Sequence, residues 1–164
     1  MCQSLKNYYT YTLLKSTIKP ELLINRVIEQ GHISLAITEK GNLFSSIKFY
    51  KLCKEKKIKP ILGCDFYVGD WKNGGRISSL TVLAKNEKGW KALIKAVSES
   101  NKKENYNSER QIPTLTEERL AEILNGNCFV YTGGISSTFA CNLFNDKWEE
   151  AIKCRNYEVC RKLV

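Results

Sequence analysis

Two continuous apolar runs, with a helical segment between them, constrain this chain more than any other feature of its sequence. The first run is ISLAIT (residues 33–38), and the second is KPILGCDFYV (residues 59–68). Runs without polar alternation are typical of strands that a parallel sheet buries on both faces. Residues 43–56 are predicted to form a helix, and a helix is the usual connection between two parallel strands. The sequence therefore predicts a strand–helix–strand unit.

Further elements continue this alternation of strands and helices. Pro20 stands at the first turn of a predicted helix, and Gly31 is suited to end it. The Asn-Gly-Gly within residues 70–76 predicts a hairpin that joins the second apolar run to a strand over residues 77–84. Asn86 is expected to cap the next helix, in which apolar residues recur at helical spacing. Together these elements predict an α/β fold with a largely parallel sheet or barrel.

The second half of the chain has weaker signals. Residues 98–113 are polar, and we expect them to form a long surface loop. Thr114 and Glu117 fit a capping box for a short helix that ends at Leu124. A strand over residues 127–132 and two further helices complete the predicted pattern.

The length of 164 residues is that of one domain with a hydrophobic core. We expect residues 1–164 to form a single domain that is part of a longer protein, because a closed barrel would need more strands. No apolar run approaches the roughly 18 residues that a membrane helix needs. The first residues also lack the pattern of a secretory signal. We therefore expect a cytoplasmic protein with no membrane partner.

Cysteine usage and charge narrow the class of function. Seven cysteines lie scattered along the chain with a single histidine, so neither a disulfide framework nor a zinc knuckle is expected. The net charge of +9 favours acidic partners such as nucleic acid. The lysines of residues 51–60 also fit the solvated face and last turn of a helix, so both interpretations stay open.

Ligands in α/β folds bind at the carboxyl ends of the strands. The predicted ends are Lys6-Asn7-Tyr8, Glu39-Lys40, Asp65, Ala84-Lys85 and Thr132-Gly133-Gly134. A hydrolytic metal cluster needs several histidines and carboxylates, whereas these ends offer only Glu39 and Asp65. Glu39 and Lys40 fit either an ion pair or two solvated side chains.

Three segments resemble the PHP (polymerase and histidinol phosphatase) domain. They are YTLLKSTIKPELL, LAITEKGNLFSSIKFYKLCKEKKIKPILGCDFYV and LTVLAKNEKGWKALIKAVSES. The likeness is to the PHP domain that opens the α subunit of bacterial DNA polymerase III. The later ERLAEILNGNCFVYTGGISS is similar to that family's next strand and turn. The resemblance covers most of the chain and implies a PHP-like distorted (β/α)7 barrel, which we expect to be incomplete here.

The resemblance also locates the positions at which active members of the family hold metal ions. Here they are occupied by Lys6, Tyr8, Thr10, Lys15, Glu39, Lys40, Asp65, Ser79 and Gly134. Lys40 replaces the histidine of the family's TDHGNLF motif, and only Glu39 and Asp65 keep acidic character. We expect these to be vestigial positions, with no catalytic and no metal-binding residue. Lys40 is expected to form an ion pair where a metal once balanced Glu39 and Asp65.

These departures predict a non-catalytic, degenerate PHP domain that acts as a structural or interaction scaffold in DNA replication, with no cofactor of its own. The resemblance implies the rest of a polymerase chain as partner, together with a proofreading exonuclease, and DNA indirectly. Nucleotidyl transfer by a parent protein would need Mg²⁺ in a downstream region. Two alternatives stay open: a metal-dependent phosphoesterase or 3'–5' exonuclease with rearranged ligands, and a free-standing module that mimics the polymerase domain.

Overall fold

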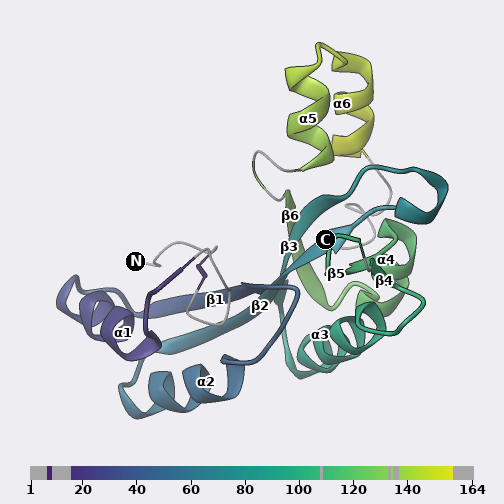
Figure 1. Ribbon diagram of the computed structural model, residues 1–164. Helices are drawn as coiled ribbons and strands as arrows, with labels where there is room; N and C mark the ends of the chain where they lie inside the picture. The colour runs from purple at the N-terminus through teal and green to yellow at the C-terminus, as the bar shows by residue number, and fades with distance from the viewer. Residues whose placement is uncertain (1–6, 9–15, 108, 133, 135–136, 157–164) are drawn as a thin grey trace.

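The computed structural model describes residues 7–8, 16–107, 109–132, 134 and 137–156, with the backbone alone for residues 153–156. The elements, drawn in Figure 1, are α1 (Pro20–Glu29), β1 (Ser34–Lys40), α2 (Ser46–Glu55), β2 (Lys59–Val68), the 3-10 turn η1 (Trp71–Asn73), β3 (Ser78–Ala84), α3 (Glu87–Ser100), β4 (Tyr106–Asn107), β5 (Ile112–Leu115), α4 (Glu117–Leu124), β6 (Cys128–Thr132), α5 (Thr138–Phe144) and α6 (Trp148–Asn156).

One mixed sheet of six strands has β2 at its centre. β1 runs parallel to β2, and β5 pairs parallel with the last two residues of β2. β3 is antiparallel to both β2 and β6, and β4 is antiparallel to β5. The predicted α/β class is confirmed, and the sheet of the described residues is open, as expected of an incomplete barrel.

The expectation of a largely parallel sheet is wrong, because only two of the five pairings in the described residues are parallel. The cause is the connection between β2 and β3. Strands joined by a short loop without a crossover must run antiparallel. The predicted hairpin is therefore confirmed, although its loop is longer than a two-residue turn and includes η1 and Gly74 with φ 77°.

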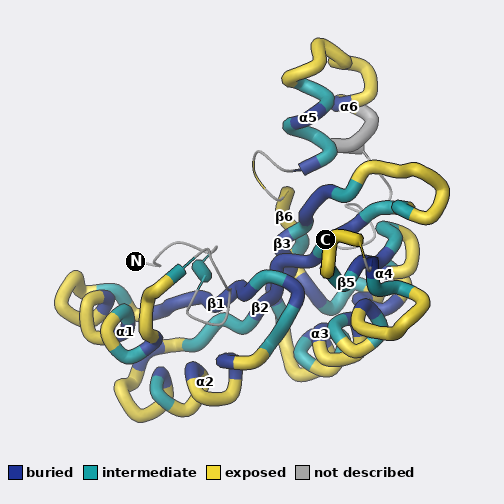
Figure 2. The backbone as a smooth tube through the Cα atoms, in the orientation of Figure 1, coloured by how far each residue is buried: buried dark blue, intermediate teal, exposed yellow. Residues whose placement is uncertain are grey.

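Two hydrophobic clusters form where helices cover one face of this sheet. The first joins α1 and α2 to β1 and includes Ile24, Val27, Leu35, Ile37 and Phe49. The second joins α3 and α4 to β2, β3 and β6 and includes Phe66, Val68, Val82, Leu93, Leu120 and Leu124. Figure 2 shows β1 buried along most of its length, whereas the outer surfaces of the helices are exposed. Burial of these side chains, at about 1.5–3 kcal/mol each, is the main stabilisation of the fold.

Several local predictions are confirmed. α1 begins at Pro20, and Gly31 follows it with φ 71°, which is the left-handed conformation that glycine adopts without strain. The Asn86 side chain caps α3 by accepting a hydrogen bond of 2.9 Å from the Gly89 N–H. α4 ends at Leu124, but its cap is Thr116, which accepts from Arg119 N–H, and Thr114 lies in β5 instead.

Residues 98–113 contain more regular structure than the expected surface loop. α3 continues to Ser100, and the short strands β4 and β5 pair through Tyr106 and Asn107. The segment reverses the chain so that β5 reaches the edge of β2, a pairing distant in sequence that local composition does not indicate.

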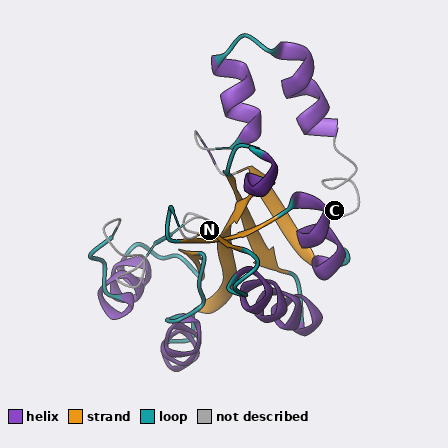
Figure 3. Cartoon of the chain, turned by 45° about the vertical axis from the view of Figure 1, so that its right-hand side comes forward, coloured by secondary structure: helices purple, strands orange, loops and turns teal. Residues whose placement is uncertain are grey.

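The last two described helices stand apart from the sheet as a hairpin, as Figure 3 shows. α5 is capped by Ser137, and its first residue, Thr138, donates a hydrogen bond of 2.9 Å to Ser78 at the start of β3. Ala151 of α6 is 1% exposed where the two helices meet. Within the described residues, none of the helices combines the length and hydropathy that crossing a bilayer requires.

Candidate functional site

The candidate site lies on the face of the sheet opposite the two hydrophobic clusters. Successive side chains of a strand point to opposite faces, so the register of β1, β2 and β3 decides which residues share a face. Lys40 pairs with Asp65, Asp65 with Thr81, and Tyr67 with Ser79. We call the face that carries Lys40, Asp65, Tyr67, Ser79 and Thr81 the site face.

Lys40 and Asp65 form a buried ion pair at the centre of the site face. The Lys40 Nζ lies 2.8 Å from the Asp65 Oδ2, and the two side chains are 7% and 0% exposed. Removing two charges from water is costly, and the cost is offset only when the geometry is good and further hydrogen bonds are made. The pair therefore requires additional partners nearby.

Two hydroxyl groups supply these partners. The Tyr8 hydroxyl donates a hydrogen bond of 2.6 Å to Asp65 Oδ2, and the Thr81 hydroxyl donates one of 3.0 Å to Oδ1. Burial raises the pKa of the Tyr8 phenol, and the hydrogen bond to Asp65 and the charge of Asp65 raise it further. Tyr8 thus stays a neutral donor, and both carboxylate oxygens are satisfied.

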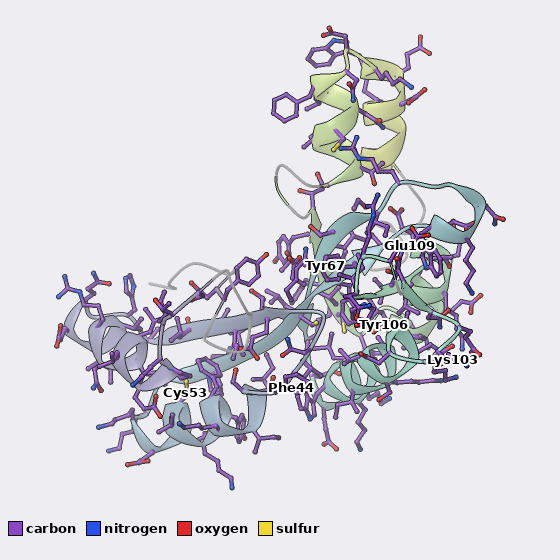
Figure 4. The ribbon with its side chains drawn as sticks, in the orientation of Figure 1. Phe44, Cys53, Tyr67, Lys103, Tyr106 and Glu109 are labelled. Atoms are coloured by element: carbon purple, nitrogen blue, oxygen red, sulfur yellow. The ribbon has the colours of Figure 1, made fainter. Side chains whose placement is uncertain are left out.

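The aromatic ring of Tyr67 completes the surroundings of the ammonium. Lys40 Nζ lies 4.5 Å from the centroid of the Tyr67 ring, within the range of a cation–π interaction. Figure 4 labels Tyr67 near the middle of the sheet. Burial, and next the charge of Asp65, raise the pKa of the Tyr67 phenol. Lys40 is therefore held by a carboxylate and by an aromatic face.

Glu39 does not belong to the site face, so the ion pair expected of Lys40 is made with Asp65, while Glu39 lies on the other face of β1. Glu39 pairs in register with Cys64, and its side chain is directed to the helix side of β1. It is 1% exposed, and its Oε2 accepts a hydrogen bond of 3.2 Å from Ser45 N–H at the start of α2. Glu39 therefore supports the entry into α2.

The turn between β1 and α2 is held by local contacts. Gly41, at φ 68°, donates its N–H to the Asp65 carbonyl at 2.9 Å. The Asn42 side chain donates to the Lys40 carbonyl and accepts from Phe44 N–H, which closes the turn. The Cys64 thiol donates to the Glu39 carbonyl at 3.3 Å, and burial raises its pKa. These residues fix where Lys40 emerges.

The other predicted positions differ in their relation to this cluster. Ser79 is 1% exposed on the site face, because an antiparallel β3 places its beginning beside the end of β2. Gly134 is exposed beyond the end of β6, and its carbonyl accepts from Ser137 N–H. Lys6, Thr10 and Lys15 lie outside the described residues.

Ala84 and Lys85, expected at the same edge as Asp65, lie at the opposite edge of the sheet. The antiparallel direction of β3 places its carboxyl end beside the first half of β2, with Leu83 opposite Gly63. The error follows directly from the assumption that this strand runs parallel to its neighbours.

Two members of the site, Thr81 and Tyr67, were missed by the sequence analysis. The predicted hairpin could have indicated both residues. An antiparallel pair of strands places residues directly opposite one another, and period-two alternation puts Thr81 on the same face as Ser79. The exact register, which also depends on the length of the loop, was needed to match Thr81 with Asp65.

The described residues of the site face do not fit a metal ion. Its carboxylate, Asp65, already accepts from Lys40, Tyr8 and Thr81, and the Lys40 ammonium would repel a cation. In the part of the chain that the structure describes, no group of three or more His, Cys, Asp or Glu side chains is placed to hold a metal. The arrangement is that of a neutralised, hydrogen-bonded cluster.

The chain is similar to one protein family and to several known proteins. The family model described as "PHP domain" matches residues 4–157. DNA polymerase III subunit alpha of Buchnera aphidicola is 31% identical over 149 residues, which cover 90% of this chain and 12% of the relative. The Borreliella burgdorferi subunit alpha is 38% identical over 96 residues, which cover 54% of this chain and 8% of the relative.

The Vibrio cholerae subunit alpha is 26% identical over 150 residues, which cover 92% of this chain and 13% of the relative. The chain thus spans about an eighth or less of the length of these relatives. A solved structure from Bifidobacterium adolescentis is described as a proposed metal-dependent phosphoesterase. The match covers 66% of this chain and 44% of the chain in that structure. Its TM-score is 0.37 at 12% identity.

Proposed function

The chain belongs to the PHP domain family, and on this premise we propose that it is a degenerate, non-catalytic PHP domain with a scaffold role in DNA replication. It is related to the DNA polymerase III subunit alpha over most of its described length. The loss of catalysis and the scaffold role are our proposal, supported by the chemistry of the site face.

The ion pair of Lys40 and Asp65 is the observation that carries this proposal. Lys40 occupies the position at which the family resemblance expects a histidine ligand, and its ammonium lies 2.8 Å from the carboxylate. A fixed ammonium can supply the positive charge that a buried carboxylate requires. The lysine thereby preserves the packing of the strands while it removes a ligand and opposes the entry of a cation.

The same substitution explains why a scaffold role is favoured over catalysis. A phosphoesterase of this type would need several ligands that converge on metal ions, together with a water that they activate. On the described site face, the Asp65 carboxylate is engaged by the Lys40 ammonium and by the hydroxyl groups of Tyr8 and Thr81. Such a cluster stabilises the sheet from its polar side.

The proposed scaffold role also implies particular interaction partners for this chain. We propose that the chain packs against other regions of a DNA polymerase III α-like protein in the cytoplasm, holds a proofreading exonuclease, and meets DNA only indirectly. The net charge of +9 supports acidic surfaces or nucleic acid nearby. Any nucleotidyl transfer, with its Mg²⁺, is assigned to other regions of such a protein.

A calorimetric titration with Mn²⁺ and with Zn²⁺ tests the proposal. The protein is first treated with a chelator, and wild type is compared with Asp65→Asn and with the control Glu104→Gln, which removes an exposed carboxylate. We expect the same weak binding by all three proteins. Stoichiometric binding that is lost only in Asp65→Asn would overturn the proposal and would call for phosphoesterase and exonuclease assays.

A further inference from the structure

A groove of about 510 Å³ opens between α2 and α3, on the helix side of the sheet and at the edge opposite to Asp65. Its walls are formed by Ile47 and Tyr50 of α2 and by Glu87 and Trp90 of α3, and its floor by Pro60, Leu62 and Ala84. Lys85 and Asn86 border it where β3 passes into α3. None of these residues takes part in the site described above.

The topology of the sheet explains why this groove exists. A crossover between parallel strands places a helix over the sheet, as α2 does between β1 and β2. β2 and β3 are joined by a hairpin loop instead, so their connection adds no helix to the layer. The pairing of β2 with β3 begins at Gly63 opposite Leu83, and β3 ends at Ala84, so Pro60 at the start of β2 extends beyond the end of β3. Figure 1 shows α2 and α3 as separate helices on this side.

Two apolar side chains that line the groove are exposed: Ile47 is 57% exposed and Tyr50 is 42% exposed. Two more exposed apolar residues belong to the same part of the chain but do not line the groove. They are Ile94, one turn after Trp90 and 44% exposed, and Phe44, 76% exposed and labelled in Figure 4 between α2 and α3. Exposed apolar side chains beside a groove are typical of sites of protein interaction.

The border of the groove on α2 is positively charged. Lys51 and Lys54 follow Ile47 and Tyr50 by one helical turn and are exposed, with Lys54 Nζ 5.6 Å from the Tyr50 ring. Among the described residues, neither lysine forms an ion pair with a carboxylate. Across the groove, Glu87 is neutralised by Lys91 at 2.7 Å. The net charge at the border therefore favours a negatively charged partner.

We propose that this groove binds an acidic amphipathic helix of a partner protein. Apolar side chains at helical spacing would fill the space above Pro60 and Leu62, and carboxylates beside them would meet Lys51 and Lys54. A single-stranded nucleic acid fits less well, because the polar edges of its bases need hydrogen-bond partners that an aliphatic floor does not offer. The inference goes beyond the scaffold role and rests on different residues.

Fluorescence anisotropy with a designed peptide tests the proposal on the full chain. The probe is a fluorescein-labelled synthetic helix with leucine at i, i+3, i+4 and i+7 and glutamate between these positions. We expect saturable binding to wild type and a loss of about tenfold or more in Ile47→Asp, which places a charge in the groove. The double variant Lys51→Glu with Lys54→Glu should weaken binding by a similar factor, because it reverses the charge of the border.

Two matched controls lie outside the groove. Leu22→Asp changes an apolar side chain of α1 that is 66% exposed, and Lys95→Glu changes an exposed lysine of α3 that does not line the groove. Both should bind the peptide as wild type does, and circular dichroism should show that all variants are folded. Absence of saturable binding, or equal loss in the controls, overturns the proposal. Tighter binding of an oligodeoxythymidine, lost in the groove variants, overturns it in favour of nucleic acid.

Discussion

Glu39 and Lys40 are neighbours in the sequence but serve opposite faces of β1. The Lys40 ammonium lies 2.8 Å from Asp65 on the site face, whereas the Glu39 carboxylate accepts from Ser45 N–H on the side of α2. The pair therefore does not act as one charged unit. Each residue supports a different part of the fold, and their substitutions should have separable effects.

Lys40→Met should destabilise the protein by about 3 kcal/mol at neutral pH. The substitution removes the charge that compensates the buried Asp65 carboxylate, and breaking such a pair costs about 3–5 kcal/mol. Urea unfolding of wild type, Lys40→Met, Asp65→Asn and the double variant gives the coupling energy. We expect the double variant to be more stable than the sum of the two single losses predicts, by about 1–3 kcal/mol. An unchanged stability of Lys40→Met would contradict the substitute ion pair.

Glu39→Gln should show a much smaller coupling with Asp65→Asn. Glutamine retains a side-chain oxygen that can accept from Ser45 N–H, and the side chain lies on the other face of β1 from Asp65. The same unfolding experiment measures this cycle. A coupling energy as large as that of Lys40 would place Glu39 in the Asp65 cluster and contradict the register.

Thr81→Val should cost about 1–3 kcal/mol of stability. Valine has nearly the same shape as threonine but lacks the hydroxyl that donates to Asp65 Oδ1 at 3.0 Å, so a buried acceptor loses a partner. Thr81→Ser keeps the hydroxyl and is the matched control. Chemical denaturation of both variants checks the expectation, which would be wrong if Thr81→Ser were the more destabilised of the two.

Gly63→Ala should destabilise the sheet by about 1–3 kcal/mol because it overpacks the contact between β2 and β3. A Cβ at Gly63 would lie 2.4 Å from the Val82 carbonyl oxygen and 2.5 Å from Leu83 Cδ2. Gly31→Ala is the comparison for backbone strain alone. A Cβ added at Gly31 would meet no atom within 4 Å, but the backbone there has φ +71°. Thermal unfolding measures the stability of both variants. A stability loss in Gly63→Ala no larger than that in Gly31→Ala would argue against the close contact.

Cys53 should be protected from alkylation in the folded protein. Burial raises the pKa of its thiol from 9.0 to about 12, and the thiolate is the reactive form, so iodoacetamide should modify it slowly at neutral pH. The folded state also keeps this proton when the unfolded chain has lost it. The contribution of the Cys53 thiol to the free energy of unfolding is therefore retained below about pH 9 and lost as the pH rises towards 12.

Peptide mass spectrometry after timed alkylation measures the protection of Cys53, with the protein in urea as the reference. Urea unfolding across the alkaline range measures the change in stability, and Cys53→Ala should reduce that change. Modification of folded Cys53 as fast as in urea would show that the thiol is accessible.

Local signals in the sequence predicted much of the secondary structure correctly. The apolar run of residues 59–68 is β2, Pro20 and Asn86 stand at the beginnings of α1 and α3, and Gly31 follows α1. Helix caps, left-handed glycines and apolar runs depend on neighbours within a few residues, so one stretch of sequence carries the necessary information.

Errors arose where the outcome depended on strand direction or on distant partners. The hairpin reversed β3, which moved Lys85 to the edge of the groove and brought Thr81 opposite Asp65. The short strand β5 within a polar region formed because β2 offered an edge for pairing. Such pairings join residues far apart in sequence, which composition and periodicity do not reveal.

The sequence by itself determined the α/β class and the order of most elements, because residue types and local spacing suffice for these. Only the tertiary structure decided that Lys40 neutralises Asp65 rather than Glu39, that Tyr8 and Thr81 complete the cluster, and that a groove opens between α2 and α3. The physical reason is register. A strand turns alternate side chains to opposite faces, so only the pairing of strands determines which charges meet.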